Sequence, residues 1–524
     1  MDALGGKNYP RRWFSSLDVI IDSLPEMGKK IESNLFEKNQ YTLIIAFLFG
    51  LLNLFSVKVV HLGTFLSIIE YALIIYELAR GKTLSAFLFF LIFDTVSYEM
   101  DYFLYLENPP FTRYSFFVLP FVGPFAQIFT IILIYFQTKR KYGRIKPSSD
   151  SSYFMRWLLI LLIAGVLQGF ICILLNDNRT GDSSLYPVVY IIETMKYVAL
   201  MAFLGAGFLL SEGEYNRKVI IGCSKTLLLS LGLIALISVL IGYEAYTTEV
   251  ISGNLLAPMA SLFIPFSFTF MSYEGIAKGK GINFILFAIS ILILLVCFVR
   301  PNVMGSKWYL VVGASLFVWF SSTIHIKSIR TYFIMVVGAF VLINVLAEPL
   351  TALFSNNDYN SWKASQLIDS IDILRYNSFY EWFFSLAPSP AYRIDELLNI
   401  GIEYIEKPLY ALFGKGFGGT TLHHTPFLNW EKGGGTFSNE QIQLGAYYAM
   451  HESLAVIFLR HGILGIVFFI DTIVSLIRKI PYSNWAMLGL IWFFFFWSYC
   501  LSFWFGALAI PLCMNILSKN KKSF

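Results

Sequence analysis

Long apolar runs, separated by short polar stretches, repeat along most of the chain. A transmembrane helix needs about 20 predominantly apolar residues to cross the hydrocarbon core of a bilayer. The first two runs and the last two runs are so closely spaced that each pair could form one bent or re-entrant unit. We therefore predict an all-α integral membrane protein with twelve to fourteen transmembrane helices, whose candidate runs lie near 41–57, 59–78, 84–100, 115–137, 157–175, 186–210, 222–242, 255–272, 283–299, 308–324, 331–348, 453–476, 485–499 and 501–517.

One long polar segment, residues 349–451, interrupts this pattern. Within it the stretch 378–388, SFYEWFFSLAP, is rich in aromatic residues and is typical of an element that lies in the membrane surface. A helix that stops at Pro408 is predicted further on. The helix is expected because apolar residues recur there at helical spacing, at Ile394, Leu397, Leu398, Ile402 and Ile405.

Amino-acid composition supports a membrane protein, and the charge pattern does not indicate a nucleic-acid-binding protein. The chain has 524 residues, of which 56% are hydrophobic and only 14% are charged, whereas soluble domains carry roughly 25% charged residues. Its mean hydropathy is +0.64. The net charge of +5 does not point to nucleic acid, because no basic face with interleaved aromatic residues is present.

Lys and Arg are distributed unequally between the two sides that alternating helices would define. With the N-terminus in the cytoplasm, the predicted cytoplasmic segments hold 25 of them and the short outer loops hold five. This asymmetry follows the positive-inside rule. The resulting division is a cytoplasmic N-terminal segment 1–40, helices 1–11 over 41–348, an extracytoplasmic loop 349–451, helices 12–14 over 452–517 and a cytoplasmic tail 518–524.

Sequence motifs that bind cofactors are missing. There is no GxxxxGK[ST] loop for a nucleoside triphosphate, no HExxH pair and no CxxC pair, so we expect neither a cofactor nor a metal. The large loop is predicted to face outward, where nucleotide-linked donors do not occur. A group transfer there would need a donor that is already activated and carried by the membrane.

Candidate functional residues gather in the large loop and at its junction with the next apolar run. Arg393 stands at the start of the predicted helix, and the glycine-rich turn 414–419 follows that helix. The amides of such a turn, including those of Gly416 and Gly418, can bind an anion, although the turn can equally be loop punctuation. His451 is the last residue before the apolar run SLAVIFL. It is either an interfacial histidine without a function or part of a site.

Several ionisable side chains lie inside the predicted membrane helices, where such groups are costly and often functional. Glu193 and Lys196 are three residues apart on one helix and could neutralise each other. Arg460 and His461 could face an aqueous cavity or pair with Asp471. In the first case Arg460 would extend a cationic pocket.

The order of these motifs resembles that of the O-antigen polymerase / O-antigen ligase superfamily. Arg393 is followed by the pattern PLxxxxGxGxGG at 408–419, then by His451 and by Gly-Ile-Leu-Gly at 462–465. In that family a His, usually followed by Asn, precedes a run that ends in Gly-[Ile/Leu]-[Leu/Ile]-Gly, whereas Glu452 follows His451 here. Glu452 could orient His451, but adjacent helical positions diverge by about 100°, which favours another direction for it.

A second motif of the family is present in altered form. The family carries Gly-Ser-Arg at the outer end of a helix, and here Lys307 takes the place of the Arg, in Gly305-Ser306-Lys307. Arg300 lies one short loop away and could supply a guanidinium. The resemblance as a whole covers residues 250–470.

The resemblance implies a GT-C-like fold in a bacterial cytoplasmic (inner) membrane. It implies transfer of a glycan from undecaprenyl pyrophosphate to an acceptor hydroxyl, without a metal or a nucleotide and with inversion at the anomeric centre. His451 would act as the base, since an imidazole with a pKa near 6.5 can accept a proton at pH 7. Cations would stabilise the pyrophosphate leaving group, with Arg393 first and then Arg300 and Lys307. Supporting roles would fall to Gly416, Gly418, Glu452 and Arg460.

More than one function agrees with these implications. The preferred one is a polymerase that joins lipid-linked repeat units of a surface polysaccharide, and the alternative is a ligase that transfers finished glycan to lipid A core or to a protein. A lipid-linked-oligosaccharide flippase could also have up to fourteen spans, but it would need two similar halves and short loops. The implied partners are undecaprenyl-pyrophosphate-linked oligosaccharide, membrane lipids, a chain-length regulator and a flippase, with no nucleic acid.

Overall fold

A computed structural model of the chain describes ten continuous stretches and a few single positions. The described residues are mostly helical, as the sequence predicts. Together with the apolar helices below, they make this an all-α membrane protein. The described residues are 35–56, 60–96, 125–143, 148–175, 185–240, 376–386, 388–425, 439–448, 452–497 and 504–520, with single positions at 285–286, 288–289, 292, 334, 338, 428, 430, 437 and 450.

The helices follow the apolar runs closely. Ten of the fourteen predicted runs coincide with described helices, and the other four (255–272, 283–299, 308–324 and 331–348) lie outside the described residues apart from single positions. In the part corresponding to these runs the elements are η1 (Leu35–Glu37), α2 (Asn39–Ser56), α3 (Val60–Ala79), α4 (Thr83–Val96), α5 (Phe125–Tyr142), α6 (Ser149–Leu174), α7 (Leu185–Glu212), α8 (Glu214–Leu240), α19 (Ser453–Lys479), η8 (Ile480–Tyr482), α20 (Asn484–Phe496) and α21 (Trp504–Asn520).

Three described helices are long and apolar enough to cross a membrane, namely α6, α7 and α19. Four further apolar helices, α2, α4, α20 and α21, are shorter in the described part. A total of twelve to fourteen spans therefore stays a prediction.

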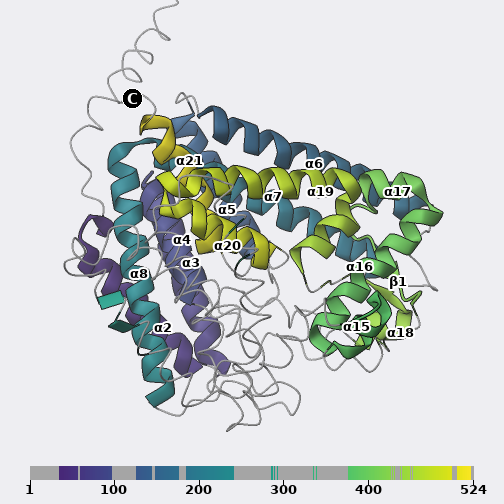
Figure 1. Ribbon diagram of the computed structural model, residues 1–524. Coiled ribbons are helices and arrows are strands. Elements are labelled where there is room, and N and C mark those ends of the chain that lie inside the picture. Colours follow the sequence, from purple (N-terminus) through teal and green to yellow (C-terminus); the bar gives the residue numbers. More distant parts are fainter. Residues whose placement is uncertain are drawn as a thin grey trace, which may run out of the picture.

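The three long helices pack side by side and form the part of the bundle that carries the large loop (Figure 1). Helices α5 and α21 pack on α7, and α20 packs between α19 and α21. A second group, α2, α3, α4 and α8, joins them through α4 and α8. Aromatic rings fill the junction. The ring centroid of Phe203 of α7 lies 5.1 Å from that of Phe87, on which it stacks, and 4.8 Å from that of Trp504.

One end of this bundle collects basic residues. Lys479, at the end of α19, pairs with Asp150, at the start of α6, at 3.3 Å, so these two helices run antiparallel. The last turn of α5 is also basic, with Lys139, Arg140 and Lys141. The sequence predicts that this end faces the cytoplasm.

The described part of the large loop lies at the other end of α6 and α19 (Figure 1). The two strands pair antiparallel, with Thr421 opposite Tyr447 and Leu422 opposite Ala446. The elements here are α15 (Phe379–Ser385), α16 (Pro388–Glu406), α17 (Pro408–Phe413), β1 (Thr421–Leu422), α18 (Asn439–Leu444) and β2 (Ala446–Tyr447).

Helix α16 is the helix that the spacing of apolar residues predicts, but it buries a different face. Asp395 and Asn399 are fully buried and Glu403 is 7% exposed, whereas Ile405 is 82% exposed. The apolar positions identified the helix correctly. They did not identify the most buried side, because the polar segment 420–425 covers Asp395, Asn399 and Glu403, while Ile400 and Tyr404 pack in an apolar cluster beside them.

Candidate functional site

Arg393 and Glu452 join the large loop to the outer end of α19. Arg393 lies near the start of α16, and Glu452 is the N-cap residue of α19. Their side chains form an ion pair and are 31% and 30% exposed. Glu452 does not cap its own helix with its side chain. Glu452, which departs from the pattern of the family that the sequence resembles, is therefore the partner of Arg393, the arginine predicted to be functional.

Three other predicted members of the site belong to parts of the chain that the structure does not describe. His451, Arg300 and Lys307 lie outside the described residues, so their roles stay predictions. His451 is nevertheless the residue that directly precedes Glu452 in the chain.

The glycine-rich turn 414–419 lies among the membrane helices. It follows α17 directly, and its backbone amides contact α6, α7 and α19. From residue 414 to residue 419 these amides donate, in order, to Tyr410 O, Leu459 O, Arg460 O, Gly165 O, Glu193 Oε2 and Gly416 O, at 2.7 to 3.2 Å. One amide of the turn, that of Gly418, donates to the carboxylate of Glu193, and binding of a substrate anion by the turn stays a prediction. The amides of Gly416 and Gly418 are thus used within the protein in this conformation.

Helix α19 breaks where it meets this turn. Gly462 has φ 57° and ψ −143°, which is not helical. A break removes the intrahelical donors of the preceding carbonyls. The amides of Lys415 and Gly416 replace them at Leu459 O and Arg460 O. The turn and the break therefore satisfy each other's backbone groups.

Glycine is required in the turn for two reasons. Gly416 has φ +74°, and a Cβ there would lie 2.0 Å from the amide nitrogen of Gly169 on α6. Gly414 has φ +72°, and its Cβ would lie 2.3 Å from the amide nitrogen of His461. The left-handed conformation favours glycine, and the close approach of backbones excludes any larger residue.

Arg460 forms an ion pair with Glu193 of α7 inside the bundle. Glu193 therefore bridges the guanidinium of Arg460 and the amide of Gly418. The sequence pointed to Lys196 as a neutralising neighbour of Glu193, and to a cavity or Asp471 for Arg460. The partners in the structure come from segments far apart in the sequence. Arg460 thus binds the same carboxylate as the turn, and its part in a cationic pocket stays a prediction.

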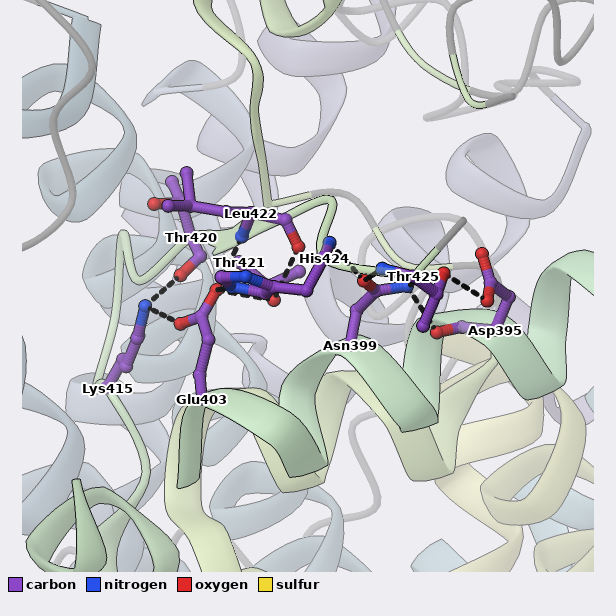
Figure 2. Close-up of polar contacts among 9 residues, drawn as sticks. All are labelled: Asp395, Asn399, Glu403, Lys415, Thr420, Thr421, Leu422, His424 and Thr425. Atoms are coloured by element: carbon purple, nitrogen blue, oxygen red, sulfur yellow. Dashed lines mark hydrogen bonds and ion pairs between the residues drawn. The ribbon is translucent and has the colours of Figure 1, made fainter. Parts of the chain in front are cut away.

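A polar cluster on α16 holds the segment that follows the turn (Figure 2). Lys415 pairs with Glu403, and their side chains are only 5% and 9% exposed. The Lys415 ammonium also donates to Thr420 O at 2.7 Å. Glu403 Oε1 in turn accepts from the Thr421 hydroxyl at 2.9 Å and the Leu422 amide at 2.5 Å, and it lies 3.1 Å from His424 Nε2.

The same cluster continues one and two turns along α16. Asn399 Oδ1 accepts from the amide of Thr425 at 2.9 Å. Asp395 accepts from the Thr425 hydroxyl at 2.6 Å and from Trp430 Nε1 at 2.7 Å. Burial raises the pKa of Asp395 above its ordinary value, and these two hydrogen bonds and the nearby His423 oppose that rise.

The pKa of Glu403 is shifted in the opposite direction, downward. Burial alone would raise its pKa, but the charge of Lys415 and the hydrogen bonds from Lys415, Leu422 and Thr421 outweigh burial. The pKa of Glu403 therefore lies below its ordinary value of 4.5.

This difference predicts how stability depends on pH. Because the pKa of Glu403 is lower in the folded chain, its contribution is fully present above about 4.5 and is lost as the pH falls through the folded value. We expect the thermal unfolding midpoint in detergent to fall as the pH goes below about 4.5. The variant Glu403→Gln should show a flatter dependence over the same range.

Asp395 provides a control of opposite sign. Its pKa is raised on folding, so its ionisation costs stability as the pH rises from the unfolded to the folded value. Asp395→Asn should therefore steepen the acid loss rather than flatten it. If both variants followed the wild-type curve, the electrostatic description of the cluster would be wrong.

The apolar pattern of the sequence does not reveal this cluster. Asp395, Asn399 and Glu403 are spaced four residues apart, which places them on one face of a helix. These three polar residues, together with the polar segment 420–425 further along the chain, are the sequence signal for a polar contact. Apolar positions alone define a different face of the helix.

Comparisons with protein-family models, with curated proteins and with solved structures found no match. Among the residues that the structure describes, no group of three or more His, Cys, Asp or Glu side chains could hold a metal ion.

Proposed function

We propose that this chain is a membrane glycosyltransferase that polymerises lipid-linked oligosaccharide repeat units. The glycan on undecaprenyl pyrophosphate would be transferred to a sugar hydroxyl of another lipid-linked unit, with inversion and without a metal. The proposal includes a GT-C-like arrangement of twelve to fourteen spans with segment 349–451 outside the bacterial cytoplasmic membrane.

A single observation carries the proposal. The ion pair between Arg393 and Glu452 holds a guanidinium beside the residue that follows His451, at the end of a candidate span. The proposed reaction needs a cation for the leaving group and a base for the acceptor at one place. Arg393 and Glu452 are far apart in the sequence, and the pair brings Arg393 to the residue that follows His451 in the chain.

The reaction assigns a role to each group. The acceptor oxygen forms a bond to the anomeric carbon on the side opposite the leaving group, and the bond from that carbon to the pyrophosphate oxygen breaks. His451 takes the proton of the acceptor hydroxyl. Arg393, with Arg300 and Lys307, stabilises the charge that develops on the pyrophosphate.

Glu452 would hold Arg393 ready for this substrate. A guanidinium binds carboxylate and phosphate oxygens through the same fork of donors. Both side chains are about one third exposed, so a pyrophosphate can reach the guanidinium and share or replace the carboxylate. Glu452 therefore positions Arg393 in the absence of substrate.

The cellular test uses a host that displays the surface glycan and lacks this protein. Loss of a polymerase should leave single repeat units on the carrier or the core, and the plasmid-borne gene should restore long chains. Long chains that accumulate on the carrier lipid would identify a ligase instead. Repeat units that stay on the cytoplasmic side would identify a flippase, and either result would overturn the proposal.

A further inference from the structure

We propose that α17 and the glycine-rich turn form a re-entrant membrane segment, in which one face of α17 contacts the acyl chains of the lipid. The face consists of Leu409, Leu412 and Phe413. This surface does not depend on the proposed enzymatic activity. It also changes the predicted loop 349–451, because part of that loop would lie within the membrane.

The exposed face of α17 is apolar. Leu409, Leu412 and Phe413 are 56%, 51% and 42% exposed, and their spacing of three and four residues places them on one side of the helix. Tyr410, on another side, is 4% exposed and packs in a core with Cys172 of α6 and Leu459 of α19. Helix α17 is thus fixed to two candidate spans while its apolar side is uncovered.

The contacts place this segment deep along both spans. On α19 the turn meets Leu459 and Gly462, six and nine residues after the helix begins, and on α6 it meets Gly169 and Gly165, five and nine residues before the helix ends. At 1.5 Å per residue these contacts lie about 8 to 14 Å along the helix axes. Half of the hydrocarbon core is about 15 Å thick. Both helices therefore place the turn inside one half of the apolar region.

The surroundings of α17 fit this depth. The neighbouring final turns of α6 expose apolar residues, including Phe170 at 52% and Leu174 at 68%, so the apolar face of α17 continues a surface that a membrane span must present to lipid. Lys407, just before α17, lies 5.5 Å from the ring of Tyr410. Lys407 is exposed, and its long side chain can extend from there toward the lipid headgroups.

The backbone also meets the requirement of a lipid environment. Irregular backbone at membrane depth must have its polar groups satisfied. All six amides of the turn have acceptors within the protein, and the charge of Lys415 is buried against Glu403. The apolar face of α17 is therefore left to the lipid, and the exposed charges of Glu406 and Lys407 lie just before the helix.

Photo-crosslinking in nanodiscs of phosphatidylethanolamine and phosphatidylglycerol tests this proposal. We would place p-benzoylphenylalanine at Leu412, irradiate the full-length protein and detect lipid adducts by mass spectrometry. Ile463 of α19, 48% exposed in a candidate span, is the positive control. Gln443 of α18, an exposed polar residue, is the negative control. Each variant must first elute as a monodisperse peak.

We expect position 412 to give lipid adducts at a yield within about threefold of position 463, and position 443 to give at least tenfold less. A yield at position 412 as low as that at position 443 would overturn the proposal. Crosslinks from position 412 to a second copy of the chain in place of lipid would also overturn it, because another protein would then cover the face. Neither result depends on whether the protein transfers glycan.

Discussion

Replacing Arg393 with alanine is expected to abolish glycan polymerisation, with a fall in rate of roughly 100-fold or more. The guanidinium is a cation that the structure pairs with Glu452, the residue after His451 in the sequence, and no neutral side chain can stabilise a pyrophosphate leaving group in its place. The protein should still accumulate normally, because the ion pair is partly exposed and such pairs contribute about 0–1 kcal/mol to stability. The measurement is chain length on the carrier lipid, normalised to protein level.

Two comparisons separate catalysis from structure. Arg393→Lys keeps the charge but loses the bidentate fork, so it should retain an intermediate rate. Lys218→Ala removes a more exposed ion pair, with Glu214 at 2.8 Å, and should leave polymerisation unchanged. A wild-type rate in Arg393→Ala would show that the proposed cation is not used.

Replacing Lys415 with methionine should be the most damaging single change to stability. The substitution leaves Glu403 charged at 9% exposure with its main partner removed, and an uncompensated buried charge costs about 3–5 kcal/mol. The same change also releases Thr420 O, which Lys415 binds at 2.7 Å. We expect a lower unfolding midpoint in detergent and less folded protein in the membrane.

The double variant Lys415→Met, Glu403→Gln is the matched control. Because it removes both charges, it should recover part of the lost stability. Lys218→Ala again gives the scale for an exposed pair. If Lys415→Met lost no more stability than Lys218→Ala, the pair beside the turn would not be buried in solution.

The membrane helices could be predicted well because a bilayer requires a continuous apolar run. The runs at 157–175, 186–210 and 453–476 correspond to α6, α7 and α19, which are long and apolar enough to cross a membrane. The stop at Pro408 was also predictable, since proline cannot continue a helix. Helix α16 ends at Glu406, and Pro408 begins α17.

The pairing of distant segments was beyond what one sequence can show. Glu193 binds Gly418 and Arg460, which lie more than 200 positions away. Spacing along a helix points only to local partners such as Lys196. The position of the glycine-rich turn was missed for the same reason, because its acceptors are carbonyls of other helices and any residue carries a carbonyl.

The partner of Arg393 was likewise hidden. Glu452 was noticed as a departure from the family pattern, but its helical position beside His451 suggested only that it faces elsewhere. In the structure the carboxylate of Glu452 points to the guanidinium of Arg393. The residue that departs from the family pattern is thus part of the candidate site.

The central claim is that Arg393 and the segment of His451 transfer glycan from a lipid pyrophosphate. It is tested most directly with purified protein in nanodiscs, a single lipid-pyrophosphate-linked repeat unit and a metal chelator. We predict lipid-linked products of two or more repeats together with released undecaprenyl pyrophosphate, and neither product with His451→Ala. A repeat unit that stays unextended with folded wild-type protein, or extension that His451→Ala leaves intact, would contradict the account.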